Sequence, residues 1–307
     1  MERRKFISTA AMAAVTLPVM ADFRISGIPA KAMASLKPDI TTGVITWIKD
    51  PEKDIQQVKD FGFDYFQAGV EEFTTGMAKK IVQTCQKYGV SPIALICMGP
   101  GPYLYNPMEG PSTIALIPRQ YRKERIQHLK DGIDFCKLAG FPGVFAHFGF
   151  IPENPKDILY LEFIDIMKDL AGYASQRGID IYFETGQETP VTLLRTIEDI
   201  GSNNLLVNLD VGNLMLYGKA NPVDGLRILA KYVRYLHAKD ADYPTNPHEL
   251  GKEYPIPEGK VDFPAIIASL KKNNFKGCIV IENELSANSK EYLQKTKKYL
   301  EALINNI

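Results

Sequence analysis

Four side chains that can bind a metal or carry a proton stand at the ends of apolar runs in the second half of the chain. They are Glu184 in IYFETG, Asp210 in LLVNLDVGN, His237 in VRYLHAKD and Glu282 in CIVIENE. Each interval between them can hold one or more strand-plus-helix units. In a closed parallel barrel the carboxyl ends of the strands converge at one mouth, where the active sites of such barrels lie. Three carboxylates and one imidazole that meet there predict a site for one divalent metal ion.

The donor types narrow the choice of metal. Oxygen ligands predominate and there is a single nitrogen, which suits Mn²⁺, Mg²⁺, Co²⁺ or Zn²⁺ better than a metal that prefers thiolates. A carboxylate is costly to bury unless it is paired or binds a cation. Taken alone, each carboxylate could be a helix N-cap or part of a strand-end ion pair. The metal hypothesis therefore depends on all four residues standing at successive strand ends.

Further polar side chains are expected at the same mouth, and we predict that they bind the substrate. They are Glu71, His147, Asn213, Lys239 and Asp240. A histidine on an apolar strand is also commonly a hydrogen-bonded core residue, so both interpretations stay open for His147.

Short apolar runs alternate with amphipathic segments from about Ser35 onward, a pattern typical of repeated strand–helix units. The predicted strands are Ile40–Thr46, Asp64–Gly69, Pro92–Met98, Gly143–Gly149, Asp180–Thr185, Leu205–Val211, Val233–Ala238 and Gly277–Glu282. The predicted helices are Ile55–Val58, Met77–Tyr88, Tyr121–Leu138, Ile158–Gln176, Pro190–Ile200, Pro222–Lys231, Phe263–Asn273 and Ser289–Leu303.

This order predicts one α/β domain, a single (β/α)8 TIM barrel over residues 35–307. Glycines such as Gly89 and Gly140 follow helices and precede strands, where a left-handed cap is needed. The alternative is a doubly wound sheet, but the chain has no GxGxxG or P-loop motif to favour it. Two long connections, Gly99–Arg119 and Asp240–Asp262, would lie on the catalytic face and are expected to form lids or substrate walls.

The first 34 residues resemble an export leader. Arg3 and Arg4 precede a small-residue apolar stretch from Ile7 to Met20, as in twin-arginine signal peptides. The stretch is too short for a comfortable membrane span, so no stable membrane anchor is expected. We predict that residues 1–34 are a signal peptide and leader, and that the protein is exported, folded, to the periplasm.

Composition excludes some classes of partner. The 36 basic and 36 acidic residues balance, so no general electrostatic attraction to nucleic acid or anionic membrane is expected. The four cysteines show no CxxC pairing and are expected to be buried thiols. A homo-oligomer is compatible with the sequence.

Motifs at the strand ends resemble those of a known family. Glu184 at the fifth strand, Asp210–Asn213 at the sixth, His237–Asp240 at the seventh and Glu282 at the eighth are similar to the xylose isomerase-like TIM barrels, the sugar phosphate isomerase/epimerase group. Supporting segments are Leu138–Phe141, Gly178–Ile181 and Glu258–Phe263. The resemblance covers the chain after the leader.

The resemblance implies that Glu184, Asp210, His237 and Glu282 are the ligands of the metal. It also implies that Glu184 and Glu282 face each other across the substrate as acid and base. A metal on the carbonyl and neighbouring hydroxyl oxygens stabilises an enediolate, and the two carboxylates then give epimerisation or aldose–ketose isomerisation.

Two positions depart from the best-known epimerases. Asn213 stands where those enzymes have a histidine, and Tyr243 stands where they carry an arginine after His237. Both positions hold substrate oxygens in the relatives, so a substrate other than a simple ketose is expected. Since phosphorylated sugars are largely confined to the cytoplasm, an exported member is expected to act on a small non-phosphorylated carbohydrate, keto sugars included.

Two other functions stay open. Metal-assisted deprotonation also serves lyases and hydratases of 3-keto-glycosides, which eliminate or add across C1–C2. A non-catalytic periplasmic sugar-binding protein would be indicated by loss of one of the four ligands, and none is lost. Multi-zinc DNA-repair enzymes share the barrel, but they need many more imidazoles than the 4 histidines here.

Overall fold

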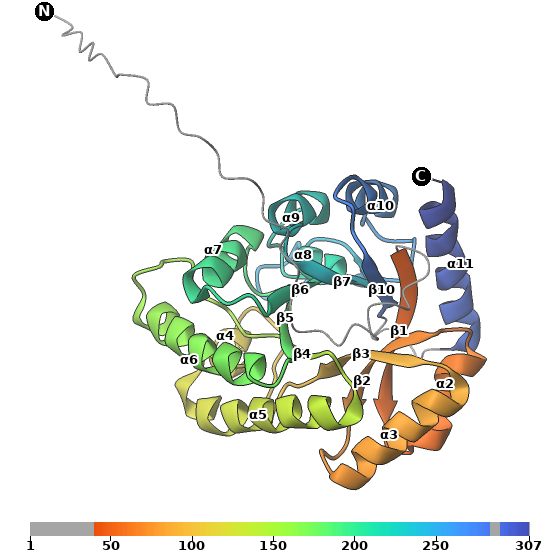
Figure 1. The fold of residues 1–307 in the computed structure, drawn as a ribbon. Coiled ribbons are helices and arrows are strands. Elements are labelled where there is room, and N and C mark those ends of the chain that lie inside the picture. Colours follow the sequence, from red (N-terminus) through yellow and green to blue (C-terminus); the bar gives the residue numbers. More distant parts are fainter. Residues whose placement is uncertain (1–39, 283–288, 307) are drawn as a thin grey trace, which may run out of the picture.

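Eight parallel strands hydrogen-bond to one another in a closed ring (Figure 1), in the order β1-β10-β7-β6-β5-β4-β3-β2. The computed structural model describes residues 40–282 and 289–306. The strands of the ring are β1 (Ile40–Ile48), β2 (Tyr65–Val70), β3 (Ser91–Ile96), β4 (Gly143–Ala146), β5 (Asp180–Glu184), β6 (Leu205–Asp210), β7 (Val233–Ala238) and β10 (Gly277–Ile281). The predicted (β/α)8 barrel is confirmed. The boundary at residue 34 stays a prediction because residues 1–39 lie outside the described part.

Helices surround the ring of strands (Figure 1). The main ones are α2 (Pro51–Asp60), α3 (Thr75–Tyr88), α5 (Arg122–Ala139), α6 (Ile158–Ser175), α7 (Pro190–Ile200), α9 (Pro222–Leu229), α10 (Phe263–Lys272) and α11 (Lys290–Asn306). Side chains that accept backbone N–H groups begin several of them, among them Asp50, Thr74 and Thr189. The predicted glycine caps Gly89 and Gly140 adopt the left-handed conformation at the ends of α3 and α5.

Several short elements were not predicted. These are α4 (Gly110–Thr113), the 3-10 turn Arg119–Tyr121, α8 (Val211–Leu216) and the two-stranded sheet of β8 (Asp240–Ala241) and β9 (Glu253–Tyr254). They lie in the connections that follow β3, β6 and β7, so the long connections at the carboxyl ends of the strands are partly ordered. Helix α2 is also longer than predicted, because Asp50 caps it and Pro51 occupies its first turn.

The core forms two layers. One cluster of buried side chains fills the inside of the barrel and includes Phe145, Tyr182, Tyr235 and Val280. The rings of Tyr182 and Tyr235 meet edge to face, 5.0 Å between centroids. A larger cluster lies between the strands and the helices. Because aromatic side chains pack the interior, ligands can be held only towards the mouth of the barrel.

The connection after β3 is organised by Arg125, a residue of α5 that is fully buried. Its guanidinium donates to the carbonyl oxygens of Pro100, Pro102, Thr113 and Ala115 at 2.7 to 2.9 Å. One cation thus satisfies four backbone acceptors along the connection. The predicted wall over the catalytic face therefore has a fixed conformation.

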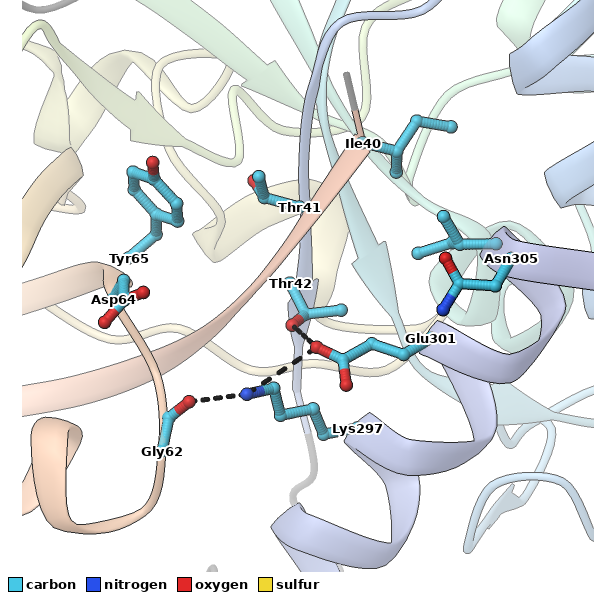
Figure 2. A pocket seen from close by; sticks show the side chains of 10 residues that line it. Ile40, Thr41, Thr42, Gly62, Asp64, Tyr65, Lys297, Glu301 and Asn305 are labelled. Atoms are coloured by element: carbon cyan, nitrogen blue, oxygen red, sulfur yellow. Dashed lines mark hydrogen bonds and ion pairs between the residues drawn. The ribbon is translucent and has the colours of Figure 1, made fainter. Parts of the chain in front are cut away.

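A pocket at the opposite end of the barrel is lined by residues of β1, β2 and α11 (Figure 2). Lys297 Nζ donates to the carbonyl oxygen of Gly62 at 2.5 Å, and Thr42 Oγ1 donates to Glu301 Oε1 at 3.1 Å. These contacts join the first strands to the last helix. The pocket is not a candidate active site because it lies at the amino ends of β1 and β2.

None of the helices in the described part of the chain is long and apolar enough to cross a membrane.

Candidate metal centre

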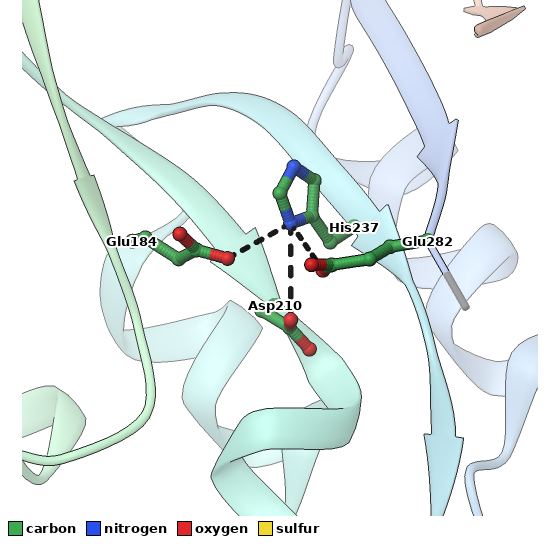
Figure 3. Close-up of side chains that lie close together, drawn as sticks. All are labelled: Glu184, Asp210, His237 and Glu282. Atoms are coloured by element: carbon green, nitrogen blue, oxygen red, sulfur yellow. Dashed lines mark hydrogen bonds and ion pairs between the residues drawn. The ribbon is translucent and has the colours of Figure 1, made fainter. Parts of the chain in front are cut away.

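The four predicted ligands meet at the carboxyl ends of β5, β6, β7 and β10 (Figure 3). Ligand atoms of Glu184, Asp210, His237 and Glu282 all lie within 4.8 Å of one another. His237 Nδ1 is central, at 3.0 Å from Glu184 Oε1, 2.8 Å from Glu282 Oε2 and 3.7 Å from Asp210 Oδ2. Asp210 and His237 are fully buried and Glu184 is 5% exposed, while the side chain of Glu282 is 16% exposed. The site is therefore open to the mouth mainly at Glu282.

The direction of the Asp210 carboxylate follows from its place in the chain. Asp210 ends β6 and caps α8, and its Oδ1 accepts the backbone N–H of Asn213 at 2.8 Å. Thr185 Oγ1 accepts the backbone N–H of Asp210 at 2.9 Å and donates to its carbonyl oxygen at 3.0 Å. With Oδ1 engaged and the backbone held on both sides, Oδ2 is left facing the other ligands.

Two buried carboxylate oxygens of the cluster contact only the cations His237 and Lys239 and accept no further hydrogen bond in the described part of the chain. They are Asp210 Oδ2 and Glu282 Oε2. Three buried carboxylates that share two cationic side chains are incompletely compensated, and such groups commonly bind a metal. The residues present thus fit a divalent cation held by three carboxylates and His237 Nδ1.

Lys239 contributes a positive charge beside this cluster. Its Nζ lies 3.4 Å from Asp210 Oδ2 and 3.3 Å from Glu282 Oε2, and the residue is only 2% exposed. Gly212 makes room for it, because a Cβ at that position would lie 2.6 Å from Lys239 Cγ. One ammonium balances one of the three carboxylates, so a divalent cation would compensate the rest.

Charge coupling sets the protonation of the cluster. Burial alone would lower the pKa of His237, but the carboxylates of Glu282 and Glu184 outweigh it and raise that pKa well above its ordinary value. Burial likewise favours the neutral form of Glu282, yet Lys239 and His237 hold its pKa well below its ordinary value. Burial raises the pKa of Asp210. A cation at His237 Nδ1 would replace the proton there.

The second nitrogen of His237 contacts two buried amides that the sequence analysis missed. His237 Nε2 lies 2.7 Å from Gln67 Oε1 and 2.8 Å from Asn208 Nδ2, and Gln67 Nε2 donates to Asn208 Oδ1 at 3.1 Å. All three side chains are fully buried. The available signal was a polar residue inside an apolar strand, in YFQAGV and LLVNLD. Because Nε2–H can donate to Gln67 Oε1, Nδ1 is the nitrogen that would bind a cation once its own proton is displaced.

The predicted substrate-binding residues differ in position. His147 Nε2 lies 3.4 Å from Glu184 Oε2, and Asn213 Oδ1 accepts a hydrogen bond from Lys239 Nζ at 3.3 Å. Glu71 is exposed and pairs with Lys49 at 3.8 Å. Asp240 accepts the backbone N–H groups of Gly259 and Val261 at 2.8 and 3.0 Å. The structure thus brings His147, Asn213 and Lys239 to the centre, whereas Glu71 and Asp240 engage other partners.

Two more polar residues follow β5 and were not predicted. Gln187 is 1% exposed, and neither atom of its amide has a hydrogen-bond partner within residues 40–282 and 289–306. Burial raises the pKa of the neighbouring Glu188 to about 8. Both side chains lie in the turn that joins Glu184 to α7, where the sequence shows only a polar loop.

Known proteins share this fold. The chain is 27% identical over 161 residues to an inosose dehydratase of Lacticaseibacillus casei, an alignment that covers 45% of this chain and 53% of that relative. It thus spans about half the length of that curated relative. Among solved structures, a xylose isomerase domain protein from Planctomyces limnophilus superposes with a TM-score of 0.81 at 28% identity, over 87% of this chain and 99% of the other.

A D-tagatose 3-epimerase-like protein superposes with a TM-score of 0.68 at 21% identity, over 86% of this chain and 98% of the other. At that identity the likeness concerns the fold. The family model described as xylose isomerase-like TIM barrel matches residues 55–303. The chain therefore belongs to the xylose isomerase-like TIM-barrel family.

Proposed function

We propose that the protein is a divalent-metal-dependent isomerase or epimerase that acts on a non-phosphorylated keto sugar. The observation that carries the proposal is the cluster of three carboxylates around His237 Nδ1, in which two buried carboxylate oxygens contact only His237 and Lys239 among the described residues. A bound divalent cation would stabilise the negative charge that develops on substrate oxygens when a proton leaves the carbon next to a carbonyl.

The positions of the two glutamates support a role for both in moving that proton. Glu184 and Glu282 stand on opposite sides of His237 Nδ1 (Figure 3), at 3.0 and 2.8 Å from it. A base on one side of the substrate and an acid on the other can remove a proton from one face and return it to the opposite face. His147 beside Glu184, and Lys239 beside Glu282, are donors for substrate oxygens.

Elimination of water is the second candidate. It needs the same metal and the same base, followed by loss of a hydroxyl group rather than reprotonation. The relative that carries the name inosose dehydratase favours this alternative.

Solvent-deuterium exchange followed by NMR tests the proposal. The protein loaded with Mg²⁺ or Mn²⁺ would be incubated in D₂O with neutral ketoses, aldoses and 3-keto-glucosides. Deuterium next to a carbonyl, lost on addition of a chelator, is the expected result. An epimer or isomer as product identifies the first candidate, and an unsaturated keto sugar identifies the second. Metal binding with no exchange in any sugar would overturn both.

Glu282→Gln provides the matched variant, because it removes a ligand charge and a proton carrier with almost no change in volume. Exchange is expected to fall at least about a hundredfold while the protein remains folded. Near-normal exchange in this variant, measured at saturating metal, would remove Glu282 from the mechanism.

Export to the periplasm is also proposed, on the paired arginines Arg3 and Arg4 and the apolar stretch after them. Fractionation of cells that make the full chain, with N-terminal sequencing of the product, tests it. A product that keeps residue 1 in the cytoplasmic fraction would overturn it.

A further inference from the structure

Trp47 is the only tryptophan of the chain and is 66% exposed. It is the penultimate residue of β1, at the end of the strand that faces the barrel mouth. Strand β1 lies in the ring between β2, which carries Gln67, and β10, which Glu282 directly follows. The indole therefore starts from a strand that is flanked by residues of the metal centre.

The direction of the indole follows from the strand register. Trp47 pairs with Gly69 of β2, two residues after Gln67, whose side chain points into the barrel and meets His237. Side chains two residues apart on a strand share a face, so a Cβ on Gly69 would also point inward. That Cβ would lie 2.2 Å from Cε3 and Cζ3 of the Trp47 ring. The indole thus covers the inner face of β2, one layer nearer the mouth than the contact between Gln67 and His237.

Gly69 leaves the space that the Trp47 ring occupies. Any side chain at position 69 would have to displace the ring, so the glycine lets the indole lie against the backbone. The other face of the ring accounts for the exposure of Trp47, and leaving so much apolar surface in water forgoes hydrophobic stabilisation. A flat apolar surface thus borders a strongly polar metal centre, and a ligand that fits both needs polar edges and an apolar face.

Ring-closed polyols combine polar edges with an apolar face. Their hydroxyl groups project around the edge of the ring, and their C–H groups form a rigid face that packs against the electron-rich face of an aromatic side chain. An open-chain keto sugar has several rotatable bonds and no fixed C–H face, so stacking would require it to lose more conformational freedom.

We propose that Trp47 is a stacking platform that selects ring-closed keto polyols, such as keto-glycosides or keto-cyclitols, over open-chain keto sugars. The inference rests on the proposed function and specifies the form of its substrate. The carbonyl and a neighbouring hydroxyl of such a ring would face the carboxylate cluster, while the C–H face lies on the indole.

Non-reactive polyols test binding apart from catalysis. Methyl β-D-glucopyranoside and myo-inositol represent closed rings, and sorbitol and galactitol represent open chains. Because the chain has one tryptophan, its emission reports on position 47 alone. With Mg²⁺-loaded protein, the cyclic polyols are expected to change the emission saturably, at concentrations where the open-chain polyols leave it unchanged.

Calorimetry on two variants measures the contribution of the ring. Trp47→Ala is expected to weaken binding of the cyclic polyols roughly tenfold, whereas Trp47→Phe keeps a flat aromatic face and should stay within about threefold of the parent. Equal affinity for cyclic and open-chain polyols, absence of binding by any of them, or unchanged affinity in Trp47→Ala would each overturn the inference. Mg²⁺ titration of both variants shows whether the barrel is intact.

The deuterium-exchange assay tests the proposed chemistry separately from the stacking role of Trp47. Exchange that continues in Trp47→Ala with an unchanged KM would contradict the stacking role alone. Cyclic polyols that bind at Trp47 in a protein without exchange activity would contradict the proposed chemistry and leave the stacking role standing.

Discussion

A histidine binds a metal through a nitrogen that carries no proton, so the partner of its other nitrogen decides which atom is available. In this protein Nε2 of His237 can donate to Gln67 Oε1 at 2.7 Å, and Nδ1 faces the three carboxylates. Gln67 is itself fixed by its bond to Asn208. We infer that Gln67, oriented by Asn208, holds the imidazole in the tautomer that a metal would require.

Replacing Gln67 with Leu removes the acceptor at similar volume. The affinity for Mn²⁺ or Mg²⁺, measured by titration calorimetry, is expected to fall about 10- to 100-fold. Gln187→Leu is the matched control, because the Gln187 amide is equally buried and has no hydrogen-bond partner within the described residues. Equal loss of affinity in the two variants would assign the effect to general disturbance of the barrel.

Lys239 differs from Gln67, because its positive charge would compete with a bound metal. Its ammonium lies within 3.4 Å of carboxylate oxygens of both Asp210 and Glu282. Lys239→Met is therefore expected to bind the metal at least as tightly as the parent, while turnover falls roughly a hundredfold or more because the proposed substrate donor is lost. Metal titration and steady-state kinetics separate the two effects. Weaker metal binding in Lys239→Met would show that the lysine supports the ligands instead.

Among the elements, the connection after β3 depends on one residue of α5. Arg125 donates to four carbonyl oxygens of that connection, and its guanidinium lies 4.3 and 4.5 Å from the ring centroids of Tyr103 and Tyr121. Tyr105 in the same connection contacts the ring of His147, 5.8 Å between centroids. Arg125 thus fixes the conformation of the connection that contacts His147 at the site.

Arg125→Met is expected to release this connection and to lower the free energy of unfolding by at least about 3 kcal/mol, because the buried carbonyl groups of Thr113 and Ala115 lose their donor. Limited chymotrypsin digestion should then cut at Tyr103 or Tyr105, whereas the parent resists. Arg125→Lys keeps the charge but offers fewer donors, so its rate of cleavage should be intermediate. Identical digestion of all three proteins would show that the connection is held by other contacts.

The same elements show what a sequence can predict. Strands such as Leu205–Asp210 are recognisable because apolar runs and glycine caps repeat along the chain, and the four clustered side chains are recognisable because each ends such a run. Gln67 and Asn208 could not be paired in advance, since their contact depends on the register of strands far apart in the ring. The fold of the connection after β3 depends on Arg125, a charged residue that would ordinarily be assigned to the surface.

At the scale of the whole molecule, burial of Glu188 links stability to pH. The residue is 4% exposed, and burial raises its pKa from 4.5 to about 8. Below about pH 4.5 the side chain is protonated in both the folded and the unfolded chain. As the pH rises from there towards 8, the unfolded chain releases the proton while the folded protein retains it. The contribution of Glu188 to stability therefore falls over this range and is constant above it.

Glu188→Gln removes the titration and keeps the shape. The variant is expected to melt close to the parent at pH 4.5 and clearly above it at pH 9, since each unit of pKa shift corresponds to about 1.4 kcal/mol. Glu162→Gln is a control of opposite sign, because hydrogen bonds from Arg119 and Arg122 lower the pKa of Glu162 to about 2. Replacing Glu162 with Gln should lower the melting temperature at pH 9. Parallel melting curves for Glu188→Gln and the parent across this range would mean that Glu188 ionises normally in the folded protein, and that the turn after β5 is open to water.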